Sequence, residues 1–155
     1  MSPVGKPAAG DIPSAVLFAC SENSIRSPMA AGLMQHLYGS KVFVSSAGVR
    51  TGELDPFAVA VMAEIGIDLS RHKAQSFDEL EDTSFDVVVS LSPEAHHRAL
   101  ELTRTMAIAA EYWPTQDPSA VHGSREQVLN AYRAVRDGLK GRILSRFGTL
   151  AAPGV

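Results

Sequence analysis

The residues best suited to chemistry in this sequence are Cys20 and Arg26, which are separated by five residues, and Ser27, which directly follows the arginine. A thiolate is a strong nucleophile, and a guanidinium can bind two oxygens of a tetrahedral oxyanion through paired hydrogen bonds. The Ser27 hydroxyl can donate to the sulfur, which stabilises the thiolate both at rest and as a leaving group. The pattern therefore predicts a nucleophile in a site for oxyanions such as phosphate, sulfate or arsenate.

The residues between the cysteine and the arginine are expected to form an anion-binding loop. A continuous apolar run over Ala15–Ala19 predicts a buried strand before the loop, and Pro28 is well suited to the first position of a helix after it. Backbone N–H groups of a loop that closes onto a helix N-terminus converge on a bound anion. The loop residues assigned to this site are Ser21, Glu22, Asn23, Ser24, Ile25 and Ser27.

A lone cysteine at the end of an apolar strand is more often a small buried hydrophobic residue than a nucleophile. The context of Cys20 favours the nucleophile, because a buried strand precedes it and Arg26, Ser27 and Pro28 follow it at the required spacing.

The rest of the chain alternates short strand-like runs with longer helical patterns. Apolar alternation and β-branched runs predict four strands, over Ala15–Ala19, Lys41–Ser46, Phe85–Leu91 and Ala107–Tyr112. Helical spacing predicts four helices, over Pro28–Tyr38, Pro56–Ile65, Pro93–Leu102 and Ser124–Arg146. This alternation predicts a single α/β domain with a four-stranded parallel sheet and helices on both faces. Ligands bind at the carboxyl ends of strands in such sheets, and the first strand leads to Cys20.

We expect residues 1–14 to form a flexible arm, residues 15–147 to form the α/β domain and residues 148–155 to form a flexible tail. In the closing helix we expect Val128, Tyr132, Val135, Leu139 and Ile143 to face the core. We expect Arg125, Arg133 and Arg136 to face water.

Composition narrows the function classes. The 155 residues are 45% hydrophobic and 20% charged, with a formal net charge of −3, which disfavours nucleic-acid and anionic-membrane binding. The single cysteine excludes an intramolecular disulfide, and no pattern of metal ligands is present. Asp11 and Pro13 interrupt the apolar stretch that a secretory signal would need, so we expect a cytoplasmic protein. We expect it to be a monomer or a weak dimer.

The segment from Val16 to Cys20, with Arg26-Ser27-Pro28-Met29-Ala30 after it, resembles the signature of low-molecular-weight protein tyrosine phosphatases and the related thioredoxin-coupled arsenate reductases. The resemblance extends over roughly Ala15 to Arg146. Further matches are Ser46-Ala47-Gly48, Gly66-Ile67-Asp68 with His72 downstream, and Asp117-Pro118. The resemblance implies a four-stranded parallel sheet flanked by helices, with no metal or organic cofactor.

The resemblance also implies a role for individual residues. Cys20 would attack phosphorus and become a phosphocysteine, and Arg26 would bind the phosphoryl oxygens. Asp117 would protonate the leaving oxygen and then activate water. Asn23 would hold the loop by bonding to Ser46, and His72 would support that network.

Three departures from the family pattern affect the substrate. Glu22 stands where the phosphatase loop usually has glycine, and its carboxylate disfavours a dianion unless it points away. Ser119-Ala120-Val121, directly after Asp117-Pro118, contains no aromatic residue that could contact a phosphotyrosine ring. Phe57 and Trp113, the nearest candidates for that contact, are expected to pack in the core. The additional cysteines of thioredoxin-coupled arsenate reductases are absent.

The leading hypothesis is therefore phosphomonoester hydrolysis through a phosphocysteine, acting on phosphotyrosine proteins or small aryl phosphates. The alternatives are arsenate reduction with an external thiol such as glutathione, and a catalytically weak oxyanion-binding regulatory module.

Overall fold

The computed structural model describes residues 12–81 and 84–148, and most of the predicted arm and tail lies outside them. Four parallel strands form one sheet in the order β2-β1-β3-β4. Their bounds are β1 Ala15–Cys20, β2 Phe43–Gly48, β3 Val87–Ser90 and β4 Ala109–Tyr112. The helices are α1 Arg26–Tyr38, α2 Pro56–Ala63, α3 Pro93–Leu102 and α4 Arg125–Phe147. The predicted fold class is confirmed.

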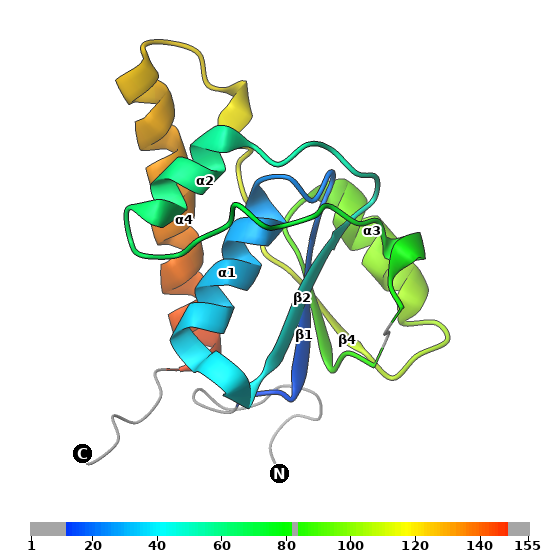
Figure 1. Cartoon of the computed structure of the whole chain (residues 1–155). Helices are drawn as coiled ribbons and strands as arrows, with labels where there is room; N and C mark the ends of the chain where they lie inside the picture. Colours follow the sequence, from blue (N-terminus) through cyan, green and yellow to red (C-terminus); the bar gives the residue numbers. More distant parts are fainter. Residues whose placement is uncertain (1–11, 82–83, 149–155) are drawn as a thin grey trace, which may run out of the picture.

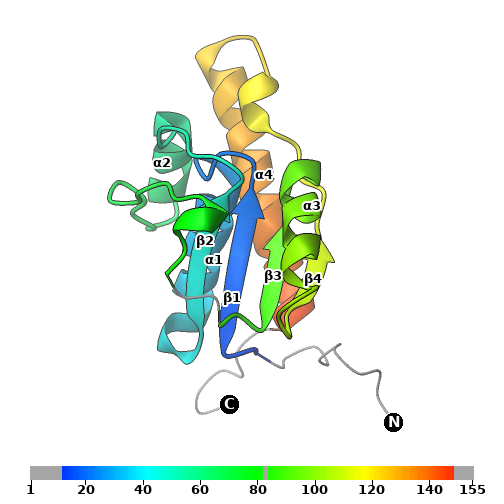
Figure 2. The ribbon, with the colours of Figure 1, turned by 90° about the vertical axis from the view of Figure 1, so that its right-hand side faces the viewer.

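Helices cover both faces of the sheet. α1 and α4 pack side by side on one face and α3 covers the other (Figures 1 and 2). All six residues of β1 are buried, and their side chains alternate between the two cores. Val16 and Phe18 contribute to the core under α1 and α4, whereas Leu17 and Ala19 contribute to the core under α3. Burial on both faces explains why this strand is apolar throughout.

The second, third and fourth strands differ from their predicted bounds, and β4 begins at Ala109, two residues later than predicted. β2 begins at Phe43, two residues later than predicted, because Gly39–Lys41 forms a short 3₁₀ helix after α1. β3 covers only the central part of Phe85–Leu91.

The third helix is confirmed as predicted. Ser92 accepts a hydrogen bond from the N–H of Ala95 at 3.2 Å and caps the start of α3.

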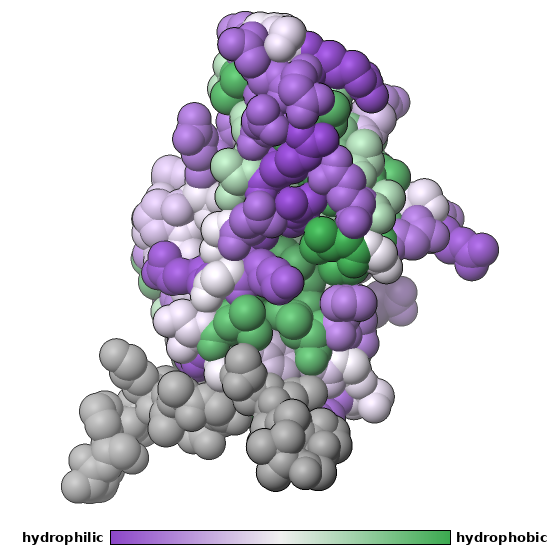
Figure 3. Space-filling view, turned by 90° about the vertical axis from the view of Figure 1, so that its left-hand side faces the viewer, coloured by the Kyte–Doolittle hydropathy of each residue, from purple (hydrophilic) through white to green (hydrophobic). Residues whose placement is uncertain are grey.

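The burial of α4 corrects one expectation. Arg136 is only 8% exposed, so the prediction that it faces water is wrong. Its guanidinium donates to the carbonyl of Val61 and to Glu64, each at 2.8 Å, and both partners come from the α2 segment. Arg133 also pairs with Glu64. The face on the side of α2 and α4 carries mostly hydrophilic residues in its upper part, with a smaller apolar area lower down (Figure 3).

The residues from which the candidate site is built follow the carboxyl ends of the strands, at one edge of the sheet. Cys20 is the last residue of β1 and lies opposite Gly48, the last residue of β2. Trp113, directly after β4, donates its N–H to the carbonyl of Ser90 at the end of β3. The loops that follow β1, β2 and β4 therefore begin close together.

Within the described residues, no helix is both long and apolar enough to cross a membrane.

Candidate active site

The loop after β1 turns its carbonyl groups outward. The carbonyls of Cys20, Ser21 and Glu22 accept hydrogen bonds from the N–H groups of Val49, Arg50 and Gly52, at 3.2, 3.0 and 2.9 Å. The Ser24 carbonyl likewise accepts from the N–H of Asp55. In a trans peptide the N–H points opposite to the carbonyl, so the N–H groups of residues 21–25 face the inside of the loop. No acceptor in the described part of the chain takes them, as an anion-binding loop requires.

Asn23 holds this loop in shape. Its φ of 56° places it in the left-handed region, which asparagine adopts more readily than most residues. Its side-chain amide donates to the hydroxyls of Ser27 and Ser46, both at 2.9 Å, and its side-chain oxygen accepts the N–H of Gln75. His72 Nε2 donates to its carbonyl at 2.9 Å. The bonds to Ser46 and His72 are those the family resemblance implies.

Cys20 lies at the floor of the loop. It is 2% exposed, and its Sγ is 3.0 Å from the hydroxyl oxygen of Ser27. That hydroxyl accepts from the Asn23 amide, and the acceptors within reach of its own proton are the sulfur at 3.0 Å and the Ala47 carbonyl at 3.5 Å. Helix α1 begins at Arg26, directly after the loop, so the positive end of its dipole lies beside the anion-binding loop.

Arg26 joins the loop to the segment that carries Asp117. Its Nη1 donates to the carbonyl of Thr115 at 3.0 Å. Asp117 accepts hydrogen bonds at Oδ1 from the N–H and the hydroxyl of Ser119, at 2.9 and 2.7 Å, and begins a short 3₁₀ helix. These bonds orient the carboxylate from a loop that follows β4.

The three predicted catalytic residues line one cavity of about 330 Å³. Its lining consists of Cys20, Ser21, Glu22, Ser24, Ile25, Arg26, Arg50, Glu94, Asp117 and Ser119. Asn23 and Ser27 are buried behind the loop, and Ser46 and His72 support it from the same side. The structure therefore separates residues that face a ligand from residues that hold the loop.

The rim of this cavity contains ionic contacts that the sequence did not suggest. Arg50 donates to both carboxylate oxygens of Glu94, at 3.0 and 3.3 Å, and its Nε lies 3.6 Å from Glu22. The Arg50 guanidinium lowers the pKa of the Glu94 carboxyl, and Glu94 in turn raises the pKa of Arg50. Arg50 follows β2 and Glu94 begins α3, so only the fold brings them together.

Gln75 is another residue that the sequence did not reveal. Its N–H bonds to Asn23, and its side-chain amide donates to the carbonyl of Ser46 at 2.9 Å. It belongs to no local motif, and no signal in its own segment indicates that it supports the loop.

The two aromatic candidates pack away from the cavity, as expected. Trp113 is 3% exposed and its ring meets Phe18 edge-on at 6.0 Å. Phe57 packs against Tyr132, with ring centroids 5.4 Å apart. Among the described residues that line the cavity, none is aromatic.

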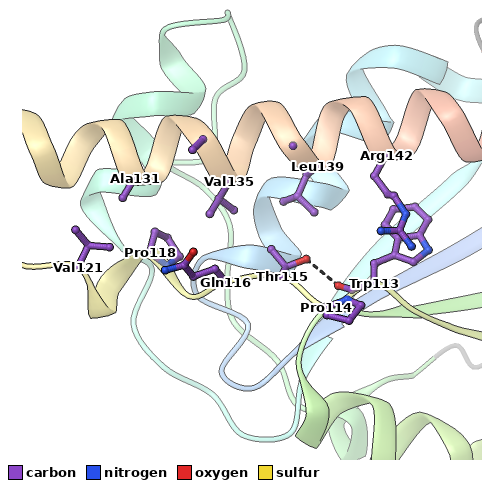
Figure 4. A pocket seen from close by; sticks show the side chains of 12 residues that line it. Trp113, Pro114, Thr115, Gln116, Pro118, Val121, Ala131, Val135, Leu139 and Arg142 are labelled. Atoms are coloured by element: carbon purple, nitrogen blue, oxygen red, sulfur yellow. Dashed lines mark hydrogen bonds between the residues drawn. The ribbon is translucent and has the colours of Figure 1, made fainter.

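A second cavity, of about 360 Å³, lies behind the Asp117 segment, between Trp113–Val121 and α4 (Figure 4). Arg142 lies over the Trp113 ring at one end, 5.2 Å from its centroid. Thr115 lines this second cavity, and its carbonyl accepts a hydrogen bond from Arg26, which lines the first. The lining of this second cavity holds no thiol and no carboxylate, whereas Cys20 and Asp117 line the first.

No group of three or more His, Cys, Asp or Glu side chains in residues 12–81 and 84–148 is arranged to hold a metal ion.

Known proteins resemble this chain over most of its length. The chain is 34% identical over 128 residues to a glutaredoxin arsenate reductase of a Synechocystis species, which covers 83% of this chain and 92% of that protein. The solved structure of an arsenate reductase in its oxidized state matches with a TM-score of 0.73 at 28% identity, covering 89% of this chain and 99% of that one. A low molecular weight protein tyrosine phosphatase from T. tengcongensis matches with a TM-score of 0.69 at 27% identity, covering 84% and 95%.

The model of one protein family, described as low molecular weight phosphotyrosine protein phosphatase, matches residues 15–151. This range includes the whole sheet, the loop from Cys20 to Ser27 and the Asp117 segment. The chain therefore belongs to the low molecular weight phosphotyrosine protein phosphatase family.

Proposed function

We propose that this protein hydrolyses phosphate monoesters through a phosphocysteine at Cys20. The observation that carries the proposal is that Cys20, Arg26 and Asp117, which come from separate segments, line one cavity. A nucleophile, a fixed cation and a proton donor are the groups that phosphoryl transfer requires.

In the first step the Cys20 sulfur attacks phosphorus, a sulfur–phosphorus bond forms and the ester phosphorus–oxygen bond breaks. Asp117 gives its proton to the leaving oxygen. Oδ2 is suited to this role, because Oδ1 is already bonded to Ser119. Arg26 and the inward N–H groups of the loop bind the phosphoryl oxygens.

In the second step water attacks the phosphorus of the phosphocysteine, and Asp117 takes up a proton from that water. The sulfur leaves as a thiolate, stabilised by the Ser27 hydroxyl, and inorganic phosphate is released. This cycle needs one sulfur atom, and the chain contains one cysteine. It also needs no reactant other than water.

The substrate is expected to be a phosphotyrosine protein or a small aryl phosphate. Because no aromatic side chain lines the described cavity, a substrate ring would contact Ile25 and polar residues such as Arg50 and Ser119. We therefore expect binding to depend mainly on the phosphoryl group.

Arsenate reduction is the second candidate, and the names of the relatives favour it. Cys20 would attack arsenate with loss of hydroxide or water to give a thiol–arsenate adduct. A thiol such as glutathione would then attack the sulfur. A disulfide forms, the sulfur–arsenic bond breaks, and its electron pair reduces arsenic from As(V) to As(III). Because the chain has a single cysteine, both this thiol and the one that reduces the mixed disulfide must be external.

Turnover of p-nitrophenyl phosphate and of arsenate with glutathione, measured side by side, separates these activities. We expect phosphate release by the parent protein, a loss of more than about 10³-fold in Cys20→Ser and a loss of about 10²-fold in Asp117→Asn. Asp78→Asn, at an exposed carboxylate that does not line the cavity, is the matched control and should retain full activity.

Arsenite release that requires glutathione, without phosphate release, would favour the reductase. Tight binding of inorganic phosphate with neither activity would favour the regulatory module. Phosphate release that survives Cys20→Ser would contradict the proposed mechanism.

A further inference from the structure

The charges around the cavity pose a problem for an anionic ligand. The lining holds three carboxylates, Glu22, Glu94 and Asp117, but only two guanidinium groups, Arg26 and Arg50. A dianion entering this cavity would meet an excess of negative charge unless some carboxylates are neutralised or turned away. The positions of these side chains show how that is achieved.

Glu22 is the carboxylate that most needs to be controlled, because it belongs to the anion-binding loop itself. Its carbonyl accepts the N–H of Gly52 at 2.9 Å, and its side chain lies over that glycine. A Cβ added at Gly52 would lie 2.8 Å from Glu22 Oε1. The other carboxylate oxygen lies 3.6 Å from Arg50 Nε. The carboxylate is thus drawn toward the segment after β2.

Arg50 is itself fixed in place on both sides. Its N–H donates to the carbonyl of Ser21 at 3.0 Å, which ties its backbone to the loop. Its guanidinium makes two hydrogen bonds to Glu94, in the first turn of α3. One guanidinium therefore pairs with two carboxylates of the rim, Glu22 and Glu94.

We propose that Arg50 is a positioning residue that holds the Glu22 carboxylate away from the oxyanion and neutralises it. With Glu22 paired to Arg50, the ligand meets the loop N–H groups and Arg26. This inference rests on the proposed function, in that it takes a tetrahedral oxyanion as the ligand of the loop. It assigns to Arg50 an effect on the ligand that acts through Glu22.

The test is a double-mutant cycle on the binding of inorganic phosphate, measured by isothermal titration calorimetry at low ionic strength. We expect Arg50→Gln to raise the Kd for phosphate about tenfold. In a Glu22→Gln background, the same Arg50→Gln substitution should change the Kd by less than about threefold, because the loop carboxylate is gone and only Glu94 then loses its partner. The tenfold effect should shrink as salt is added, since the rim is exposed and screened.

Arg104→Gln is the matched control, because it removes the same charge from an exposed residue whose side chain makes no ion pair in the described part of the chain. It should leave the Kd unchanged. Thermal unfolding of each variant checks that the fold is intact, and exposed ion pairs of this kind contribute little to stability.

The proposal is overturned if Arg50→Gln leaves phosphate binding unchanged. It is equally overturned if Arg50→Gln weakens binding by the same factor with and without the Glu22 carboxylate, since Arg50 would then act on the anion directly. Binding does not require turnover, so the failure of the proposed hydrolysis would be visible separately, as intact coupling between Arg50 and Glu22 without phosphate release.

Discussion

At the scale of single residues, the shape of the active-site loop depends on Asn23. It combines a left-handed backbone with three side-chain hydrogen bonds, to Ser27, Ser46 and Gln75. Glycine at this position would keep the backbone and lose the bonds, whereas alanine would lose the bonds and strain the backbone. These two substitutions separate the two contributions.

We predict that Asn23→Ala lowers the free energy of unfolding by about 2–4 kcal/mol. Asn23→Gly should lower it by about 1 kcal/mol less than Asn23→Ala, because glycine accepts the positive φ. Urea denaturation monitored by circular dichroism measures both. Equal losses for the two variants would show that the left-handed backbone contributes nothing measurable.

The sequence indicated part of this residue network and missed the rest for a physical reason. Cys20 and Arg26 lie within one short segment, so their spacing reveals them, and the family resemblance implies the role of Asn23. Arg50 and Gln75 act through contacts with the loop that only the folded chain creates. Neither residue stands in a motif that predicts such a contact.

At the scale of secondary structure elements, ion pairs join α2 to α4. Glu64 accepts hydrogen bonds from Arg133 and Arg136, and these lower the pKa of its carboxyl from 4.5 to about 2. Because the carboxyl binds protons more weakly in the folded state, the stabilisation is complete above pH 4.5 and is lost as the pH falls toward about 2.

We predict that Glu64→Gln lowers the melting temperature at pH 7, and that the difference from the parent protein narrows below pH 4.5. Calorimetric scans at a series of pH values measure it, with Glu53→Gln as a control at an exposed carboxylate for which the structure gives no ion pair in its described residues. A difference of constant size from pH 7 to pH 2 would mean that the ion pairs do not determine the effect.

The contacts between α2 and α4 also show what the sequence pattern of a single helix cannot predict. The helical pattern correctly identified α4, as well as Tyr132, Leu139 and Ile143 in its buried stripe. It placed Arg136 in water, because an arginine in a helix normally faces solvent. The groups that make its burial favourable, the Val61 carbonyl in α2 and Glu64 at its C-terminal end, cannot be seen in the sequence pattern of α4.

At the scale of the whole molecule, the fold followed from the alternation of strands and helices, and the place of the site followed from the parallel sheet. The apolar β1 ends at Cys20, and the carboxyl edge of the sheet brings the Asp117 segment to the same cavity. The charged rim of the cavity could not be predicted from the sequence, because three separate segments meet there. These are the loop at Glu22, the turn after β2 at Arg50 and the start of α3 at Glu94. Membership of the family therefore does not fix the substrate, and we expect the charged residues of this rim to determine it.

The measurement that tests the central claim most directly is mass spectrometry of the Asp117→Asn variant, quenched during turnover of p-nitrophenyl phosphate. Removing the group that activates water should slow hydrolysis of the intermediate. We predict that one phosphoryl group is then found on the peptide that contains Cys20, and that the double variant Cys20→Ala, Asp117→Asn carries none. Phosphate release without any phosphorylated Cys20, or a phosphoryl group on another residue, would contradict the account.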